Sequence, residues 1–156
     1  GLSASFLGEA LRVAPELSAV FLSGGPLAEA ARQALGDRAE VIEGDVLECE
    51  VPGGFDLVLL EHVVHRYDPA QNALILRRAR EAATDGGRLL LLDFFLDEDP
   101  RQRTLDALHA AEYLVIDGTT VYPAREVRAW MTAAGWEPVQ TLDLPGSPRV
   151  IVAEAR

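Results

Sequence analysis

The stretch from residue 55 to residue 95 constrains the fold of this 156-residue chain more than any other. It begins with an apolar run at 57–60, continues through a polar tip and an amphipathic segment, and ends with a second apolar run at 89–92. Both runs are continuous rather than alternating, which is typical of parallel strands covered by helices on both faces. The pattern therefore predicts a strand–helix–strand unit, with polar residues gathered where the first strand ends.

Helical and strand-like patterns alternate through the rest of the chain, which is typical of an α/β protein. We expect helices over residues 3–14, 26–35, 69–85, about 105–116 and about 124–134, and strands over residues 19–22, 40–43, 57–60, 89–92, 139–142 and 150–153. The turn at residues 145–148 is too short for a crossover, so the last two strands should be antiparallel. The predicted fold is a doubly wound, mostly parallel sheet with one antiparallel strand near the C-terminal edge.

Local signals mark the ends of these helices. Pro26 suits a first helical turn, and Asp68 is a candidate N-cap. Gly36, the pair Gly86 and Gly87, and Gly135 are each placed to end a helix. The helix over residues 124–134 should bury Val127, Trp130, Met131 and Ala134, and the one over residues 26–35 should turn Leu27, Ala30, Ala31 and Leu35 inward. With 49% hydrophobic residues, the chain is expected to form one domain over residues 1–156.

Composition excludes several classes of function. The chain has 25 acidic and 14 basic residues, a formal charge of −11 that repels nucleic-acid phosphates. Every basic residue is Arg, so a lysine Schiff base or a P-loop is excluded within this segment. Cys49 is alone and forms no internal disulfide, which suits a reducing cytoplasm. There is no 18-residue apolar span, so we expect no membrane insertion and a cytoplasmic protein.

Small and polar residues end four successive strands of the predicted sheet. These ends are Ser23-Gly24-Gly25, Gly44-Asp45, residues 61–65, and Asp93. In a doubly wound sheet such positions line one crevice, where glycine permits close approach and carboxylates bind hydroxyl or amino groups of a nucleotide. The alternative is that strands end in turns, which favour the same residue types.

His65 is the candidate general base, because an imidazole titrates near neutrality and can take a proton from a phenol. Asp93, at the same end of the next strand, would orient it. The alternative is a partly exposed histidine at a helix entry. His62 lies in apolar surroundings and is expected to be a hydrogen-bonded structural histidine. A metal site of His62, His65 and Asp93 lacks a supporting motif, so no metal is expected.

The helix near residues 105–116 combines polar and apolar side chains. Leu105, Leu108, His109, Glu112 and Ile116 are expected on one face. This face is a substrate-facing surface, a half-exposed helix, or a surface covered by residues outside this sequence. His109, Glu112 and Tyr113 are the candidates for substrate binding.

Five segments together resemble a known family: Glu43-Gly44-Asp45, VHRYD at 64–68, GGRLLLLD at 86–93, Val121-Tyr122-Pro123 and AAGW at 133–136. The family is that of S-adenosylmethionine-dependent small-molecule O-methyltransferases, the caffeic-acid type and its bacterial natural-product relatives. The chain is similar to their Rossmann-like C-terminal catalytic domain over nearly all its length. In these proteins the first helix follows a glycine-rich loop, so the resemblance implies that Gly1 is the last residue of that loop and that the first strand is absent.

The resemblance also implies roles for individual residues. Asp45 and Val46 would meet the adenine of S-adenosylmethionine, while Gly1 would belong to the loop around its methionine end. Ser23, Gly24 and Glu61 complete the expected cofactor site. His65 would deprotonate an acceptor hydroxyl, with Asp93 as its acid partner.

Three positions depart from the family pattern. Ser23 stands where an acid usually holds the ribose hydroxyls, and it offers one weaker, neutral hydrogen bond. Glu61 replaces a basic residue of plant members, and Val121 replaces their second catalytic acid. Each departure bears on cofactor binding or on the surroundings of His65.

The leading functional hypothesis is methyl transfer to a hydroxyl of an aromatic or polyketide-like small molecule. The runner-up is a methyltransferase-like protein whose degenerate cofactor site serves another tailoring step or none. A third hypothesis is a non-catalytic binding or dimerisation domain. A nicotinamide-dependent oxidoreductase is disfavoured, because no complete glycine fingerprint is visible. The resemblance implies a homodimer for the parent chain, formed through an N-terminal helical domain.

Overall fold

The structure is a computed structural model that describes residues 4–97, 104–144 and 149–156, apart from the side chain of Leu105. The chain forms two compact units, Gly1–Glu50 and Val51–Arg156, and each is described by itself. Within the described ranges, no helix has both the length and the apolar character that crossing a bilayer requires.

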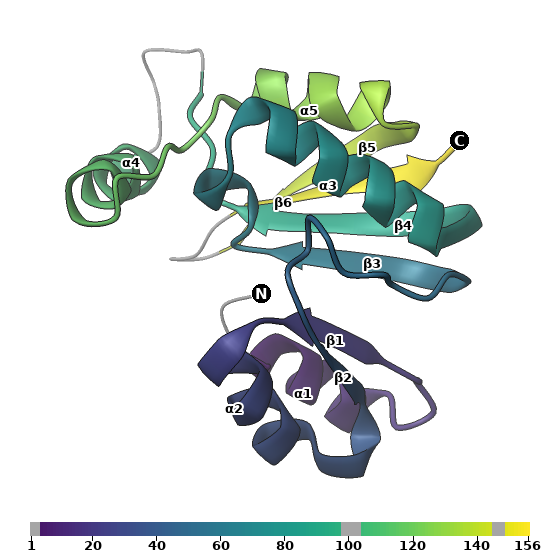
Figure 1. Cartoon of the computed structure of the whole chain (residues 1–156). Coiled ribbons are helices and arrows are strands. Elements are labelled where there is room, and N and C mark those ends of the chain that lie inside the picture. Colours follow the sequence, from purple (N-terminus) through teal and green to yellow (C-terminus); the bar gives the residue numbers. More distant parts are fainter. Residues whose placement is uncertain (1–3, 98–103, 145–148) are drawn as a thin grey trace. The chain divides into compact units, whose positions relative to one another are not determined.

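The first unit is a pair of parallel strands with two helices. Its elements are α1 (Ser5–Val13), β1 (Val20–Ser23), α2 (Gly25–Leu35), a short 3-10 turn η1 (Gly36–Arg38) and β2 (Glu40–Glu43) (Figure 1). Val20 lies opposite Glu40 and Ser23 opposite Glu43, so both strands end at the same edge. Buried side chains of this unit form a small apolar core: Ala4, Leu11, Phe21, Ala31 and Leu35.

Helix α2 begins and ends as its sequence predicts, but its buried face is rotated. Pro26 lies in the first turn, and Gly36 ends the helix with φ +53°. Ala28, Ala31 and Leu35 are the buried residues, whereas the predicted Ala30 is exposed. The apolar side of α2 is wider than two short strands can cover, so one edge of it stays in solvent.

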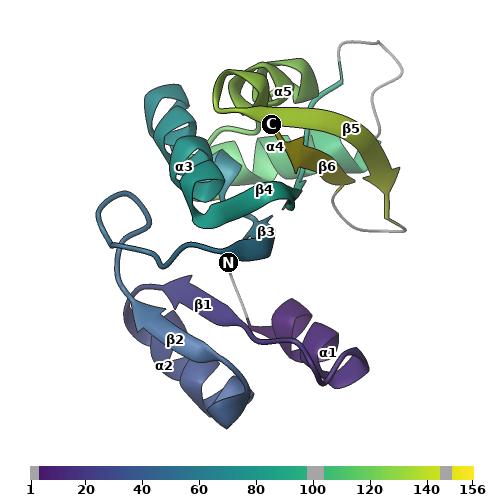
Figure 2. The same cartoon turned by 90° about the vertical axis from the view of Figure 1, so that its right-hand side faces the viewer.

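The second unit is a four-stranded mixed sheet with three helices. Its elements are β3 (Phe55–Glu61), a 3-10 turn η2 (Val64–Arg66), α3 (Pro69–Ala82), β4 (Ala83–Asp93), α4 (Thr104–Ile116), α5 (Ala124–Ala133), β5 (Trp136–Asp143) and β6 (Arg149–Ala155). The strand order is β3-β4-β6-β5, with β3 parallel to β4 and β6 antiparallel to both neighbours. This confirms an antiparallel strand next to the C-terminal edge, where β5 is the last strand (Figure 2).

Helices α3 and α5 pack side by side on one face of this sheet (Figure 1). Trp136, the first residue of β5, is fully buried and donates its indole N–H to the Leu76 carbonyl of α3 at 3.0 Å. Val127 and Met131 of α5 are buried as predicted, while Trp130 is only half-buried. On β3, Leu60 is buried but Leu57 is 51% exposed.

Helix α3 starts at the predicted place. Asp68 is its N-cap: the carboxylate accepts from the Gln71 N–H at 2.8 Å, and the Gln71 side chain accepts from the Asp68 N–H. This capping box satisfies two N–H groups that have no partner within the helix. The start of α3 is therefore determined locally.

The prediction that Gly86 and Gly87 end α3 is wrong. The helix ends at Ala82, and Ala83 is already extended and paired with Phe55 in the sheet. The next pair is Leu57 with Arg88, so residues 84–87 form an irregularity in β4. Gly86 adopts φ +75°, and a Cβ on Gly87 would lie 2.9 Å from the Thr84 carbonyl oxygen. The two glycines therefore allow the irregularity in β4, because a residue with a Cβ would not fit this tight backbone.

Substituting Gly87→Ala tests this explanation. The added Cβ would also lie 3.2 Å from the Phe55 carbonyl oxygen, and backbone atoms cannot move aside cheaply. We expect a loss of about 1–3 kcal/mol in the free energy of unfolding, measured by urea denaturation. Gly53→Ala is the control, since its Cβ would have its nearest neighbour at 3.8 Å. Equal urea midpoints for Gly87→Ala and Gly53→Ala would contradict the explanation.

Candidate active site

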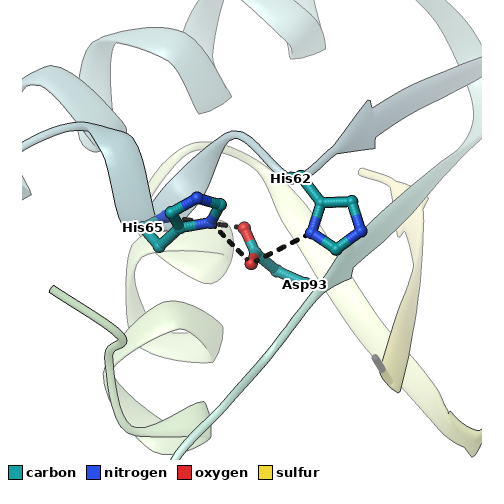
Figure 3. Close-up of side chains that lie close together, drawn as sticks. All are labelled: His62, His65 and Asp93. Carbon is teal, nitrogen blue, oxygen red and sulfur yellow. Dashed lines mark hydrogen bonds and ion pairs between the residues drawn. The ribbon is translucent and has the colours of Figure 1, made fainter. Parts of the chain in front are cut away.

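The candidate site lies at the carboxyl ends of β3 and β4. The parallel register pairs Glu61 with Leu92, so the residues after β3 lie beside Asp93, the last residue of β4. Figure 3 shows His65 and His62 on opposite sides of the Asp93 carboxylate. His65 Nδ1 lies 2.9 Å from Asp93 Oδ1, and the two residues are 5% and 0% exposed. The two predicted catalytic residues are therefore brought together as a buried pair.

Backbone N–H groups hold the Asp93 carboxylate in place. Oδ2 accepts from Val64 N at 3.0 Å and from His65 N at 3.5 Å, while Oδ1 accepts from Phe94 N at 2.9 Å. An ionised carboxylate only accepts hydrogen bonds, so its close neighbour His65 Nδ1 carries the proton. His65 Nε2 is then left with a free lone pair, as a general base requires.

The loop that carries His65 is held by a buried amide. Asn72, which is 1% exposed, donates its Nδ2 protons to the Val64 and Tyr67 carbonyls, both at 2.9 Å. The His65 carbonyl accepts from Thr120 N at 3.2 Å. These bonds fix η2 against α3, and so the imidazole meets Asp93 without reorganisation.

His62 is the single non-glycine residue with positive φ, +52°, in the part of the chain that the structure describes. Its N–H donates to the Leu92 carbonyl at 2.8 Å, and its Nδ1 lies 3.9 Å from Asp93 Oδ1. That buried Nδ1 has no hydrogen-bond partner, so the prediction of a hydrogen-bonded structural histidine is wrong. The reason is that His65 and Phe94 already occupy Asp93 Oδ1. Burial lowers the pKa of His62, and the Asp93 charge only partly opposes this.

A metal centre is the alternative use of this cluster. The candidate ligand atoms of His62, His65 and Asp93 lie within 4.8 Å of one another. Zinc, with ligands at about 2.0–2.2 Å, needs donors with free lone pairs. The Asp93 oxygens already accept from four N–H groups, so the arrangement favours a hydrogen-bonded pair over a metal site.

Two rings from α4 cover the site. The Tyr113 ring stacks on His65 with a centroid distance of 4.3 Å and an angle of 8°. The His109 ring stacks on Phe94 at 4.1 Å and 26°. Burial and the nearby Asp93 charge raise the pKa of Tyr113, so its phenol stays neutral. Two of the three predicted substrate-binding residues thus lie at the site.

The α4 face that carries Leu108, His109 and Ile116 is largely exposed, which agrees with the alternative of a half-exposed helix. Leu108 and Ile116 are 66% and 71% exposed, and Glu112 reaches the site only through His109, whose Nδ1 lies 3.0 Å from its carboxylate. The residues turned inward are Asp106, His109, Ala110 and Tyr113. The helix presents its polar side to the protein, which apolar periodicity cannot reveal.

The predicted cofactor residues of the first unit share one edge of the β1–β2 pair. Ser23 ends β1, and its carbonyl accepts from Gly44 N at 3.1 Å. Asp45 Oδ1 accepts from Leu47 N at 2.8 Å, which leaves its other oxygen for a ligand. This edge offers the Ser23 hydroxyl, the Asp45 carboxylate and the exposed backbone of Gly24. Such groups can form hydrogen bonds with the hydroxyl and amino groups of a nucleoside.

The remaining cofactor candidates are Val46, Glu61 and Gly1. Val46 follows Asp45 and is half-buried. Glu61 belongs to the second unit, at the end of β3. Gly1 lies outside the described residues.

Sequence analysis missed four residues that support the site: Asn72, Phe94, Asp106 and Arg149. Asp106 is fully buried in α4, and Arg149 of β6 lies 3.2 Å from it as an ion pair. An acidic residue within an apolar helix and an arginine at the start of an apolar strand were the available signals. Their pairing is long-range and has no local signature.

Comparison with known proteins identifies the family that this chain resembles. A sequence model of the O-methyltransferase domain family matches residues 4–137. The mitomycin biosynthesis 6-O-methyltransferase of Streptomyces lavendulae is 37% identical over 106 residues, which cover 65% of this chain and 30% of that protein. The solved mitomycin 7-O-methyltransferase MmcR is 30% identical with a TM-score of 0.86, covering 98% of this chain and 46% of that one.

A further solved structure is PigF with SAH, which is 27% identical with a TM-score of 0.82 and covers 97% of this chain and 47% of that chain. The chain spans about a third of the length of the first curated relatives and slightly less than half of these solved chains. The comparison therefore concerns one part of those proteins.

The lowered pKa of His62 predicts a pH dependence of stability. The unfolded histidine titrates near 6.5, so below that pH the unfolded chain binds more protons than the folded one. The stability contributed by neutral His62 is present above this pH and is lost as the pH falls towards the folded pKa. His62→Asn, which tolerates positive φ, should lose less stability than wild type between pH 7.5 and pH 5.5, measured by thermal melting. Parallel losses in both proteins would contradict burial as the cause.

Proposed function

The chain belongs to the family of O-methyltransferase domains, and from this we propose that it transfers a methyl group to a hydroxyl of an aromatic or polyketide-like small molecule. The observation that carries the proposal is the buried pair of His65 and Asp93, 2.9 Å apart at the carboxyl ends of two parallel strands. Since the chain spans only part of its relatives, the activity is proposed for the complete protein.

The family uses S-adenosylmethionine, whose sulfonium makes the methyl group electrophilic. We propose that Ser23, Gly24, Asp45 and Val46 hold this cofactor, and a cofactor role for Glu61 stays a prediction. The exposed polar groups at the β1–β2 edge support this assignment. A cofactor role for Gly1, a preceding strand that completes a Rossmann-like sheet, and a single domain over residues 1–156 stay predictions.

His65 acts as the general base in this proposal. Its Nδ1 proton is held by Asp93, so Nε2 takes the proton of the acceptor hydroxyl and leaves a more nucleophilic oxygen. The imidazolium that forms is stabilised by the adjacent carboxylate. The stacked Tyr113 ring and the 5% exposure of His65 keep water from this pair.

Asp93 is the single acid partner of His65 in this proposal. Val121 occupies the position of the second family acid, and it is apolar and buried. The support for one acid is that Asp93 is held by backbone donors and needs no second group to orient it.

Ser23 favours a second candidate function. A serine makes one neutral hydrogen bond where a carboxylate bridges two ribose hydroxyls. Under this alternative the protein keeps the fold, binds the cofactor poorly and performs another tailoring step or none.

The test is calorimetric titration of the complete protein with S-adenosylmethionine and, separately, S-adenosylhomocysteine. An acceptor screen then uses 3-hydroxy-5-methyl-1-naphthoate and 3-amino-4-hydroxybenzoate, which are named for two relatives. Micromolar binding and a methylated product are expected. Failure to bind either adenosyl compound would contradict the proposal and favour the alternative.

Replacing the base is a direct test of the mechanism. We expect His65→Ala to lower kcat by about a hundredfold or more, because general base catalysis contributes about that factor. Affinity for S-adenosylhomocysteine should not change, which serves as the internal control. Turnover at the wild-type rate would remove His65 from this role.

Restoring the missing acid tests the cofactor assignment. Ser23→Asp should tighten S-adenosylhomocysteine binding by about fivefold, because a charge-assisted hydrogen bond contributes about 1 kcal/mol more than a neutral one. Ser18→Asp adds the same charge at an exposed position outside the strands and is the control. Equal effects of both substitutions on the Kd would show that Ser23 does not meet the ribose.

A further inference from the structure

Helix α4 turns its polar side inward and its apolar side outward. The inward stripe is Asp106, His109, Ala110 and Tyr113, spaced by about one turn. The outward side carries Leu108, Leu114, Val115 and Ile116, which are 63–82% exposed. Apolar burial therefore contributes little to holding α4 in place. Polar and ring contacts must determine where the helix lies.

The most buried of these contacts is an ion pair at the start of α4. Asp106 is 0% exposed, and its Oδ2 lies 3.2 Å from an Arg149 nitrogen. The same guanidinium donates to Asp97 Oδ1 at 2.6 Å and to the Phe95 carbonyl. Arg149 thus joins β6, the segment after β4 and α4 through one planar group with several directed donors.

The ion pair lies in line with the rings that cover the site. His109 and Tyr113 follow Asp106 by three and seven residues, about 4.5 Å and 10.5 Å along the helix. His109 meets Phe94, and Tyr113 meets His65. A shift of Asp106 along or around the helix axis would therefore move both rings, because a helix moves as a rigid body.

We propose that Arg149 is a positioning residue for the acceptor: through Asp106 it sets the place of α4, and so of His109 and Tyr113 over His65. The expected change in acceptor KM rests on the proposed methyl transfer. The expected change in the position of α4 does not. Arg149 does not act on the reacting atoms. Its loss changes acceptor binding and leaves the cofactor residues of the first unit untouched.

The test compares four forms of the complete protein: wild type, Arg149→Lys, the double variant Arg149→Met with Asp106→Leu, and Arg88→Met. The double variant removes both buried charges, because removing one would leave the other uncompensated and endanger folding. Arg88→Met is the matched control, since Arg88 forms an exposed ion pair with Glu154 between β4 and β6. Circular dichroism and thermal melting establish that each form is folded.

Two measurements follow. The first is KM for 3-hydroxy-5-methyl-1-naphthoate or 3-amino-4-hydroxybenzoate, whichever the wild type methylates, beside Kd for S-adenosylhomocysteine. The second is the NMR shift of the His65 ring protons, assigned through His65→Asn, because the stacked Tyr113 ring moves that resonance upfield.

In the double variant we expect acceptor KM to rise at least about tenfold, since a misplacement of about 1 Å costs up to a hundredfold. Kd for S-adenosylhomocysteine should stay within about twofold, and the His65 resonance should lose its upfield shift. Arg149→Lys keeps the positive charge but loses the planar guanidinium with its several donors. Its KM and His65 resonance should lie between those of wild type and the double variant. Arg88→Met should match wild type in every measurement.

Two outcomes would overturn the proposal. One is an unchanged KM with an unchanged His65 resonance in a folded double variant. The other is an equal loss of S-adenosylhomocysteine affinity, which would mean that the ion pair supports the whole domain. If wild type methylates neither compound, the proposed function fails for these acceptors, and the His65 resonance alone decides whether Arg149 positions α4.

Discussion

The site depends on one buried carboxylate. Asp93 is fully buried and accepts hydrogen bonds from three backbone N–H groups and from the His65 ring. A buried carboxylate without these donors would be neutral or would destabilise the fold. Because the backbone donors lie in η2 and just after β4, the same bonds that make Asp93 tolerable also shape the loop that carries His65. The same hydrogen bonds therefore both stabilise the fold and hold His65 in position.

The carboxylate oxygens of Asp93 already accept hydrogen bonds, and this affects the residues around the pair. His62 Nδ1 comes within 3.9 Å of Asp93 Oδ1 yet makes no hydrogen bond, because other donors reach that oxygen first. Its left-handed backbone is the kind of local strain that gathers at functional sites. The Tyr113 ring then covers His65, and Arg149 holds the helix that carries that ring. Each feature constrains the next one outward from Asp93.

Sequence analysis predicted much of the fold, because most elements have local causes. The strand at 40–43, the N-cap at Asp68 and the antiparallel final pair are all confirmed. The role of Gly86 and Gly87 was misjudged, because a glycine pair ends a helix or fits an irregular strand equally well. Which side of α4 faces the protein was left open by the sequence. Apolar periodicity assumes that apolar side chains face the protein, and in α4 a buried ion pair and two rings reverse this.

By itself the sequence determined the order of strands and helices, the polar character of the strand ends, and the choice of His65 and Asp93 as candidates. Only the tertiary structure decided that these two side chains meet, that His62 Nδ1 makes no hydrogen bond, and that Asp106 pairs with Arg149 across 43 positions of the chain. The physical reason is the range of the interactions. Propensities, caps and apolar periodicity act within a few residues, whereas hydrogen bonds and ion pairs between side chains depend on strand register, which only the packed sheet establishes.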